Sequence, residues 1–113
     1  MEILLDVKQK KSKNLKLKAE IVFIGLNLFA SLRKGNKVLG SGSAYLNPED
    51  KWDELFGMRL ALKRASKAAY YAKIDEKIPE GWFLGKTTKD EAKDFVHRVD
   101  GAFRLAMKQR GEI

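Results

Sequence analysis

Apolar and polar residues alternate along much of the first 46 positions, and this period of two predicts β-strands. The pattern is strictest from Leu15 to Phe23, where apolar residues occupy every second position. We predict an antiparallel sheet within residues 2–46, with Gly25 marking a bulge or a bend. Residues 15–32 also fit helical spacing, but their β-branched content and the hairpin signal that follows favour strands. The predicted strands span about residues 2–8, 15–24, 26–33 and 38–46.

The dipeptide Gly35-Asn36 is a two-residue hairpin signal, because both residues tolerate the positive φ that such turns require. A two-residue loop would fix the register of the two flanking strands. On the core face, this register places Leu26, Leu28, Ala30 and Leu32 opposite Tyr45, Ser43, Ser41 and Leu39. On the other face, it places Asn27, Phe29, Ser31 and Arg33 opposite Ala44, Gly42, Gly40 and Val38.

Residues 48–73 form the first predicted helix. Asn47 is a suitable N-cap, Pro48 suits the first helical position, and the acids that follow favour the positive end of the helix dipole. Gly57 is expected to allow close packing against the sheet. The apolar stripe of this helix comprises Leu55, Met58, Leu62, Ala65, Ala69 and Ala72.

A second helix is predicted over residues 89–110, after a connection at 74–87. Residues 88–91 match the capping-box pattern, and Gly111 is the expected C-cap. Strands followed by helices indicate one α+β domain over residues 1–113, with a four-stranded antiparallel sheet and both helices on one face. The apolar stripe of the second helix comprises Ala92, Phe95, Val96, Val99, Phe103 and Ala106.

The chain contains no cysteine, which favours a reducing compartment, and we expect a cytoplasmic protein. The first residues carry acids and no long apolar core, so we expect no signal peptide, and no apolar run approaches the roughly 20 residues that span a bilayer. His97 is the only histidine, so we expect no metal site and no cofactor. The segment Gly40-Ser41-Gly42-Ser43 lacks the lysine and helix of a phosphate loop, and no catalytic pattern is present.

Basic residues are concentrated in the first part of a chain whose formal net charge is +8. Residues 1–46 contain nine Lys or Arg against three acids, whereas residues 47–113 contain fourteen against twelve. This asymmetry favours a polyanionic partner, because lysines around a hairpin can follow a phosphate backbone. The alternative is a solvated loop beside an edge strand that lysines protect from aggregation. The predicted nucleic-acid-binding residues are Lys8, Lys10, Lys11, Lys13, Lys16, Lys18, Arg33, Lys34 and Lys37.

Three aromatic residues are candidates for base stacking or partner contact. Phe29 would form a stacking shelf beside Gly40 and Gly42, or would instead pack under a helix or at a dimer interface. Trp82 and Phe83 would contact a partner or close the end of the core. A basic stripe on the first helix would grip phosphates or be the solvated side of the helix, and it comprises Arg59, Lys63, Lys67 and Tyr70.

The motifs in residues 40–50, Phe56-Gly57 and residues 60–65 resemble those of small uncharacterised bacterial and phage proteins. These motifs are a G-x-G-x-A strand, an N-P-x-D helix start and a G-x-x-L-A-x-x-R-A helix. Those proteins are similar to the double-stranded-RNA-binding domain fold, which implies a β-β-β-α core over about residues 20–70. The resemblance does not carry RNA binding over, because Glu49 and Asp50 stand where that family places lysines and would repel phosphate.

From these observations we expect a non-catalytic nucleic-acid-binding protein with low sequence preference. DNA or RNA, in single or double strands, would fit the pattern equally. The alternative is a phage-type protein-interaction module or inhibitor, which would dock on a host protein through the basic surface or the Trp82-Phe83 segment. An acidic protein partner and a homodimer are further partners that the sequence leaves open.

Overall fold

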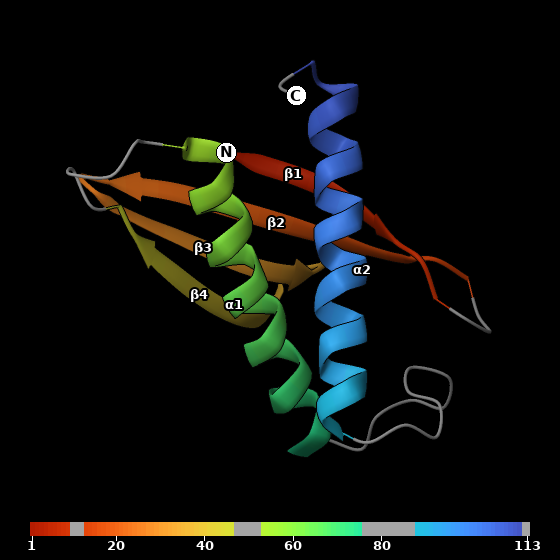
Figure 1. Ribbon diagram of the computed structural model, residues 1–113. Helices are drawn as coiled ribbons and strands as arrows, with labels where there is room; N and C mark the ends of the chain where they lie inside the picture. Colours follow the sequence, from red (N-terminus) through yellow and green to blue (C-terminus); the bar gives the residue numbers. More distant parts are fainter. Residues whose placement is uncertain (10–12, 47–52, 76–87, 112–113) are drawn as a thin grey trace.

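The structure is a computed structural model that describes residues 1–9, 13–46, 53–75 and 88–111. Four strands pair in the order β1-β2-β3-β4 as one antiparallel sheet, and both helices lie across the same face of it (Figure 1). This arrangement confirms the predicted α+β class with two helices after a four-stranded sheet. Neither helix in the described part of the chain is long and apolar enough to cross a membrane. The elements are β1 (Glu2–Val7), β2 (Leu15–Ile24), β3 (Asn27–Lys34), β4 (Lys37–Tyr45), α1 (Glu54–Asp75) and α2 (Thr88–Gln109).

Two tight turns that begin with glycine join β2 to β3 and β3 to β4. Gly25 and Gly35 have φ angles of 61° and 60°. Among the described residues, only glycines have a positive φ. Glycine with positive φ at the first position of a two-residue loop is the type II′ pattern, which suits the twist of antiparallel strands. Gly25 therefore closes a hairpin in which Ile24 pairs with Asn27, and the predicted bulge or bend within a strand was wrong.

The register between β3 and β4 differs from the prediction by one residue beyond its first pair. Arg33 lies opposite Val38 as predicted, but an irregularity between Leu32 and Arg33 makes Leu39 an extra residue on β4. Leu32 then lies opposite Gly40, so Gly40, Gly42 and Ala44 take the places opposite Leu32, Ala30 and Leu28 that were predicted for Leu39, Ser41 and Ser43. Leu39 is the extra residue of this bulge, and its side chain remains buried.

The core lies between the covered face of the sheet and the apolar stripes of the two helices. Leu28, Ala30 and Leu32 are buried as predicted, whereas Leu26 is exposed because it lies in the β2–β3 turn. On α1, Ala72 is exposed and Tyr70 is buried, so the apolar stripe ends on the tyrosine. The largest fully buried side chains include Ile3, Leu5, Ile21, Leu62, Phe103 and Met107.

Two glycines of β4 let the backbone of α1 approach the sheet closely. A Cβ atom on Gly42 would lie 2.5 Å from both the carbonyl oxygen of Ala61 and the amide nitrogen of Ala65. A Cβ atom on Gly40 would collide in the same way with the backbone of Ala65 and Ala69. The helix presents alanine at three of these contact positions, and the Cβ of Arg64 is the fourth contact, 2.6 Å from a Cβ on Gly42. The close contact therefore needs small residues on both sides.

Side-chain and glycine caps define the described helix ends. Asp53 caps α1, because its Oδ1 accepts a hydrogen bond from the backbone N–H of Phe56 at 3.1 Å. The helix thus begins at Glu54, and the predicted start at Pro48 with its Asn47 cap falls in residues 47–52, outside the described chain. Gly111, with φ 76°, ends α2 as predicted, and its N–H donates to the carbonyl of Lys108 at 3.0 Å. The predicted packing role of Gly57 is confirmed, because a Cβ atom there would lie 2.9 Å from Leu46 Cδ2.

We expect the Gly42→Ala variant to lose about 1–3 kcal/mol of unfolding free energy, because the added methyl meets helix backbone that cannot rotate away. The matched control is Gly101→Ala in α2, where no atom lies within 4 Å of the new Cβ. That variant should gain about 0.5–1 kcal/mol from helix propensity. Urea denaturation followed by circular dichroism measures both changes. Equal stability of the two variants would contradict the close contact.

Candidate nucleic-acid interface

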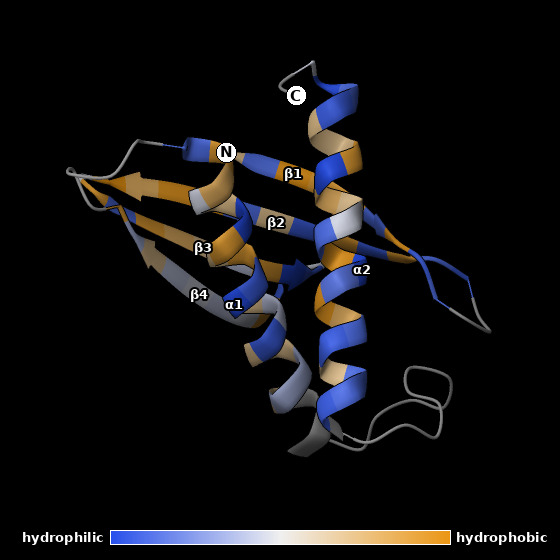
Figure 2. Cartoon of the chain, in the orientation of Figure 1, coloured by the Kyte–Doolittle hydropathy of each residue, from blue (hydrophilic) through white to orange (hydrophobic). Residues whose placement is uncertain are grey.

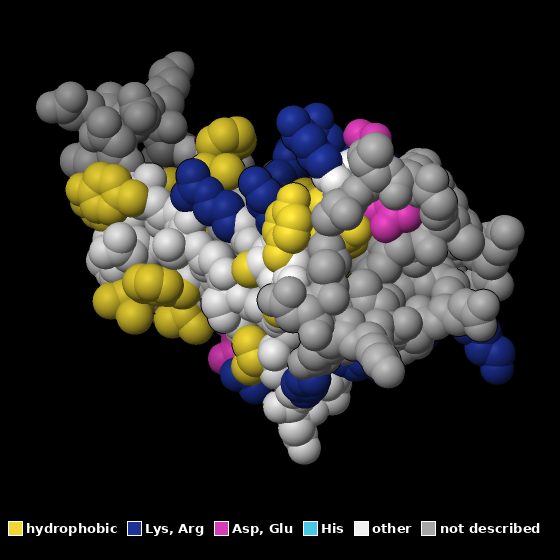
Figure 3. All heavy atoms as spheres, turned by 90° about the horizontal axis from the view of Figure 1, so that it is seen from below, with side chains coloured by type: hydrophobic (Ala, Val, Ile, Leu, Met, Phe, Trp, Pro, Cys, Tyr) yellow, Lys and Arg dark blue, Asp and Glu magenta, His cyan; other side chains and the backbone are white. Residues whose placement is uncertain are grey.

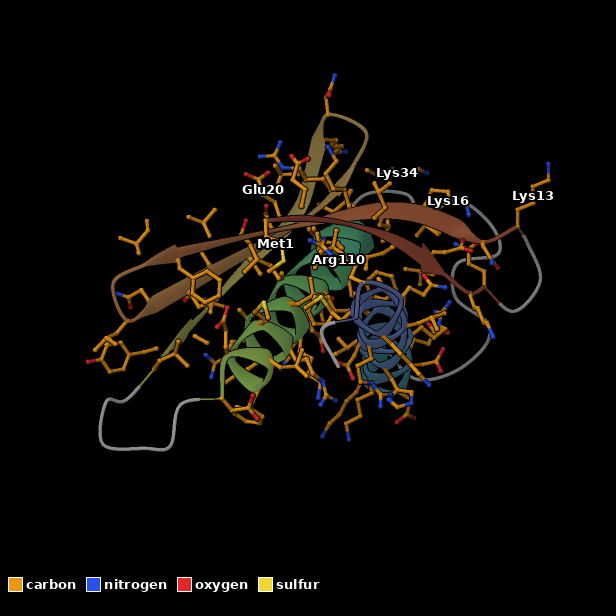
Figure 4. All side chains as sticks on the ribbon, turned by 90° about the horizontal axis from the view of Figure 1, so that it is seen from above. Met1, Lys13, Lys16, Glu20, Lys34 and Arg110 are labelled. Carbon is orange, nitrogen blue, oxygen red and sulfur yellow. The ribbon has the colours of Figure 1, made fainter. Side chains whose placement is uncertain are left out.

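The structure brings the described members of the predicted basic set to one end of the sheet. Lys8 and Lys13 flank the β1–β2 connection, and the antiparallel pairing places the Gly35 turn at the same end. Figure 4 shows Lys16 and Lys34 on the side of the sheet away from the helices, with Lys13 beyond them. Lys34 and Lys37 lie opposite each other across the turn, whereas residues 10 and 11 lie outside the described chain.

Carboxylates of neighbouring strands pair with three of these cations. Strand register makes the contacts, because Asp6 lies directly opposite Lys16 and the other two pairs reach diagonally across adjacent strands. The hydrogen bond from Lys16 lowers the pKa of Asp6. Seven described cations gather at this end, and three of them are paired with these carboxylates. The pairs are Lys16–Asp6 at 2.9 Å, Lys18–Glu2 at 3.7 Å and Arg33–Glu20 at 3.2 Å between nitrogen and oxygen.

The face of the sheet that the helices leave uncovered carries exposed apolar side chains next to this basic end. Phe29 and Val22 lie opposite each other and are 44% and 43% exposed. They line a shallow hollow of about 350 Å³, together with the backbone of the strands and Glu20, Ser31, Ser41 and Ser43. Phe29 is opposite Ser43, so the predicted shelf beside Gly40 and Gly42 was wrong, since both glycines face α1. Phe29 does not pack under a helix either.

The apolar surface continues toward the turn that joins β2 and β3. Ile24 and Tyr45 are exposed on the same face as Phe29, and Phe23 and Leu26 are exposed beside them. Figure 2 shows this end of β2 and β3 coloured as hydrophobic, and Figure 3 shows apolar side chains gathered at the same end. The uncovered face therefore grades from an apolar end at this turn to a cationic end at the opposite hairpins.

The predicted basic stripe on α1 divides into buried and exposed members. The Tyr70 side chain is buried, and its hydroxyl donates to Glu91 Oε2 at 3.1 Å. Burial, together with the hydrogen bond to Glu91, raises the pKa of Tyr70 to about 12. Arg59 is turned toward α2, whereas Lys63 and Lys67 remain exposed. Trp82 and Phe83 lie outside the described residues.

A buried carboxylate fixes the two helices relative to each other. Asp100 of α2 is 4% exposed and accepts two hydrogen bonds from Arg59 of α1, from Nε at 2.9 Å and Nη2 at 3.0 Å. Arg104 adds an ion pair at 3.3 Å from the next turn of α2. Burial alone would raise the pKa of Asp100, but the hydrogen bonds from Arg59 and the charges of Arg59, Lys63 and Arg104 hold it below its usual value.

Within residues 1–9, 13–46, 53–75 and 88–111, no group of three or more His, Asp or Glu side chains is placed to hold a metal ion. His97 is exposed and lines a groove between β1 and α2. Comparison of the chain with protein-family models, with curated proteins and with solved structures finds no match.

We expect Asp100→Asn to lower the unfolding free energy at pH 7 by about 2–4 kcal/mol, because it leaves Arg59 facing a neutral amide at a buried site. The folded chain holds the pKa of Asp100 below the unfolded value of about 3.9. Its contribution is therefore fully present above that pH and is lost as the pH falls through the folded pKa. Urea melts between pH 2 and pH 7 measure both effects.

Asp6→Asn is the matched control for this experiment, because it makes the same chemical change in a surface ion pair with Lys16. Little change in stability is expected from it, since water screens exposed pairs. If Asp100→Asn were no more destabilising than Asp6→Asn at pH 7, Asp100 would not be the anchor of the helix pair.

Proposed function

We propose that this chain is a non-catalytic nucleic-acid-binding protein with low sequence preference, and that it binds single strands on the uncovered face of the sheet. The observation that carries the proposal is the position of Phe29 and Val22. They stand exposed over a hollow on a sheet face whose neighbouring end gathers seven described cations, three of them paired with carboxylates. Both chemistries that an unpaired strand requires, a stacking surface for bases and cations for phosphates, thus share one face.

The three ion pairs at the basic end do not prevent phosphate binding. The two lysine pairs lie at the surface, where such pairs contribute only about 0–1 kcal/mol each, so exchanging their carboxylate partners for phosphates costs little. The side chains of the Arg33–Glu20 pair are about one-third exposed. Arg33 suits the exchange well, because its guanidinium can bind phosphate oxygens bidentately. Its present partner Glu20 also lines the hollow. Glu20 therefore competes with the phosphate backbone for Arg33.

The distance between the stacking residue and the nearest cation fits a short stretch of single-stranded nucleic acid. Phe29 and Arg33 lie on the same face of β3, four residues apart, which corresponds to about 13 Å. Ser31 and Ser41 lie opposite each other between them, and their hydroxyls can donate to phosphate or base oxygens. Stacking on Phe29 accepts any base, because every base has a π-face, and this explains the low sequence preference.

Unpaired bases are favoured over a duplex because a duplex keeps its bases inside the stack and would leave Phe29 unused. The order β2-β3-β4-α1 supports the proposed relationship to the double-stranded-RNA-binding domain fold. That relationship does not argue for duplex RNA here. The described start of α1 carries Asp53 and Glu54, so the helix start that would meet phosphate remains acidic.

We expect a fluorescein-labelled 30-nucleotide poly(dT) strand to bind more tightly than a duplex of equal length. If four phosphates are neutralised, the affinity should fall about fifty-fold between 50 and 200 mM salt. Phe29→Ala should weaken binding about tenfold through lost stacking. Fluorescence anisotropy at both salt concentrations measures these changes.

Glu20 and Arg33 provide a matched pair of neutralising variants. Arg33→Gln should weaken binding, whereas Glu20→Gln should strengthen it, because it removes a repulsive charge and releases Arg33 from its ion pair. Duplex preference, or no binding at 50 mM salt, would refute the proposal. A Phe29→Ala variant that binds normally would show that bases are not held on this face.

A further inference from the structure

The two helices enclose a second cationic surface on the side of the molecule away from the sheet. It is a groove of about 370 Å³ between the later half of α1 and the first half of α2. Figure 3 shows dark-blue side chains beside apolar ones in the upper middle of the view, where the two helices come together. The groove is lined by Lys63, Arg64, Lys67 and Tyr71 from α1 and by Lys89, Ala92, Lys93 and Val96 from α2.

The charges of this groove are arranged in two rows. Lys63 and Lys67 are one helical turn apart on α1, and Lys89 and Lys93 are one turn apart on α2, so each row repeats at about 6 Å. The helices run antiparallel, as the contacts Arg59–Asp100 and Tyr70–Glu91 show. Among the described residues, no carboxylate forms an ion pair with any of these four lysines. The basic end of the sheet, in contrast, is partly neutralised.

The floor of the groove between the rows is apolar. Ala92 and Val96 lie one turn apart on α2, and Tyr71 of α1 contributes a ring that is 40% exposed. Tyr71 is held in place by an edge-on contact with the buried ring of Tyr70, at 5.4 Å between centroids. An apolar floor between two cationic rows that repeat once per helical turn is complementary to an amphipathic helix with acids on both flanks.

We propose that the groove is a docking site for an acidic amphipathic helix of a partner protein. Apolar residues one turn apart on the partner would contact Val96 and Tyr71, and glutamates or aspartates beside them would pair with the lysine rows. Nucleic acid fits this surface less well, because a phosphate backbone would leave the apolar floor uncovered. The groove is lined by residues of the two helices alone, whereas the proposed nucleic-acid surface is the sheet face that the helices leave uncovered, so the two binding activities use separate residues (Figure 1).

The test uses the full chain and a synthetic 18-residue helical peptide with leucines on one face and glutamates on the flanks. A scrambled peptide of equal composition is the first control. We expect the amphipathic peptide to bind at least tenfold more tightly than the scrambled one in isothermal titration calorimetry. Tyr71→Ala should weaken it severalfold without any change in charge. In two-dimensional amide NMR spectra, the shifts that move should cluster on the two helices.

Two double variants with the same change in net charge separate this proposal from general electrostatics. Lys63→Glu/Lys93→Glu in the groove should weaken peptide binding about tenfold or more. Lys16→Glu/Lys34→Glu at the sheet should change it less than threefold. Oligonucleotide binding should instead be weakened more by Lys16→Glu/Lys34→Glu than by Lys63→Glu/Lys93→Glu. All these lysines are exposed, and thermal melts verify that each variant folds.

Several outcomes would overturn the docking site. They are equal binding of the two peptides, equal effects of the two double variants, or displacement of the bound peptide from the groove by added ATP or poly(dT). The last outcome would identify the groove as a phosphate site. Failure of the oligonucleotide to bind the sheet would refute the proposed nucleic-acid function alone. It would leave the proposal of a peptide-docking groove unaffected.

Discussion

The contact between the backbone of α1 and the two glycines of β4 determines where everything else in the molecule lies. Gly40 and Gly42 provide no side chains, so Ala61, Ala65 and Ala69 of the helix rest directly on the strand. Because α1 is held over β3 and β4 in this way, α2 takes the remaining space over β1. One face of the sheet is thereby filled, and neither of the two described helices covers the other face. The exposed Phe29 follows from this arrangement.

A single buried carboxylate has a comparable role in the helix layer. Asp100 would be costly in the core without partners, and its bidentate contact with Arg59 restricts how α2 can rotate or slide against α1. The same register brings Lys63 and Lys67 into line with Lys89 and Lys93 across the groove. A structural ion pair thus determines the geometry of a surface that it does not itself touch.

The sequence was sufficient for the strands, the Gly35 hairpin turn and most of the core, because alternation and helical spacing report directly on burial. The bulge at Leu39 was not predictable, since either register places an apolar residue on the core face. That bulge puts Gly42 beneath α1 where Ser41 was predicted, so the error spread to the site. The three cross-strand ion pairs also depend on register. For this reason the lysines could be predicted to converge, but not to be partly neutralised.

The groove was less accessible to sequence reasoning than the basic hairpins. A basic stripe on α1 is visible in the sequence, but the lysines of α2 join it only if the helices pack in one particular rotation. The one sequence signal for this rotation was Asp100, which lies next to the apolar stripe of α2. An acid at that position requires a cation on a neighbouring element. The sheet and a helix layer about 10 Å thick together separate the two cationic surfaces, so their distance exceeds the Debye length of about 10 Å at 0.1 M salt. Their charges are therefore largely screened from each other, so one chain can present different chemistries to two partners at once.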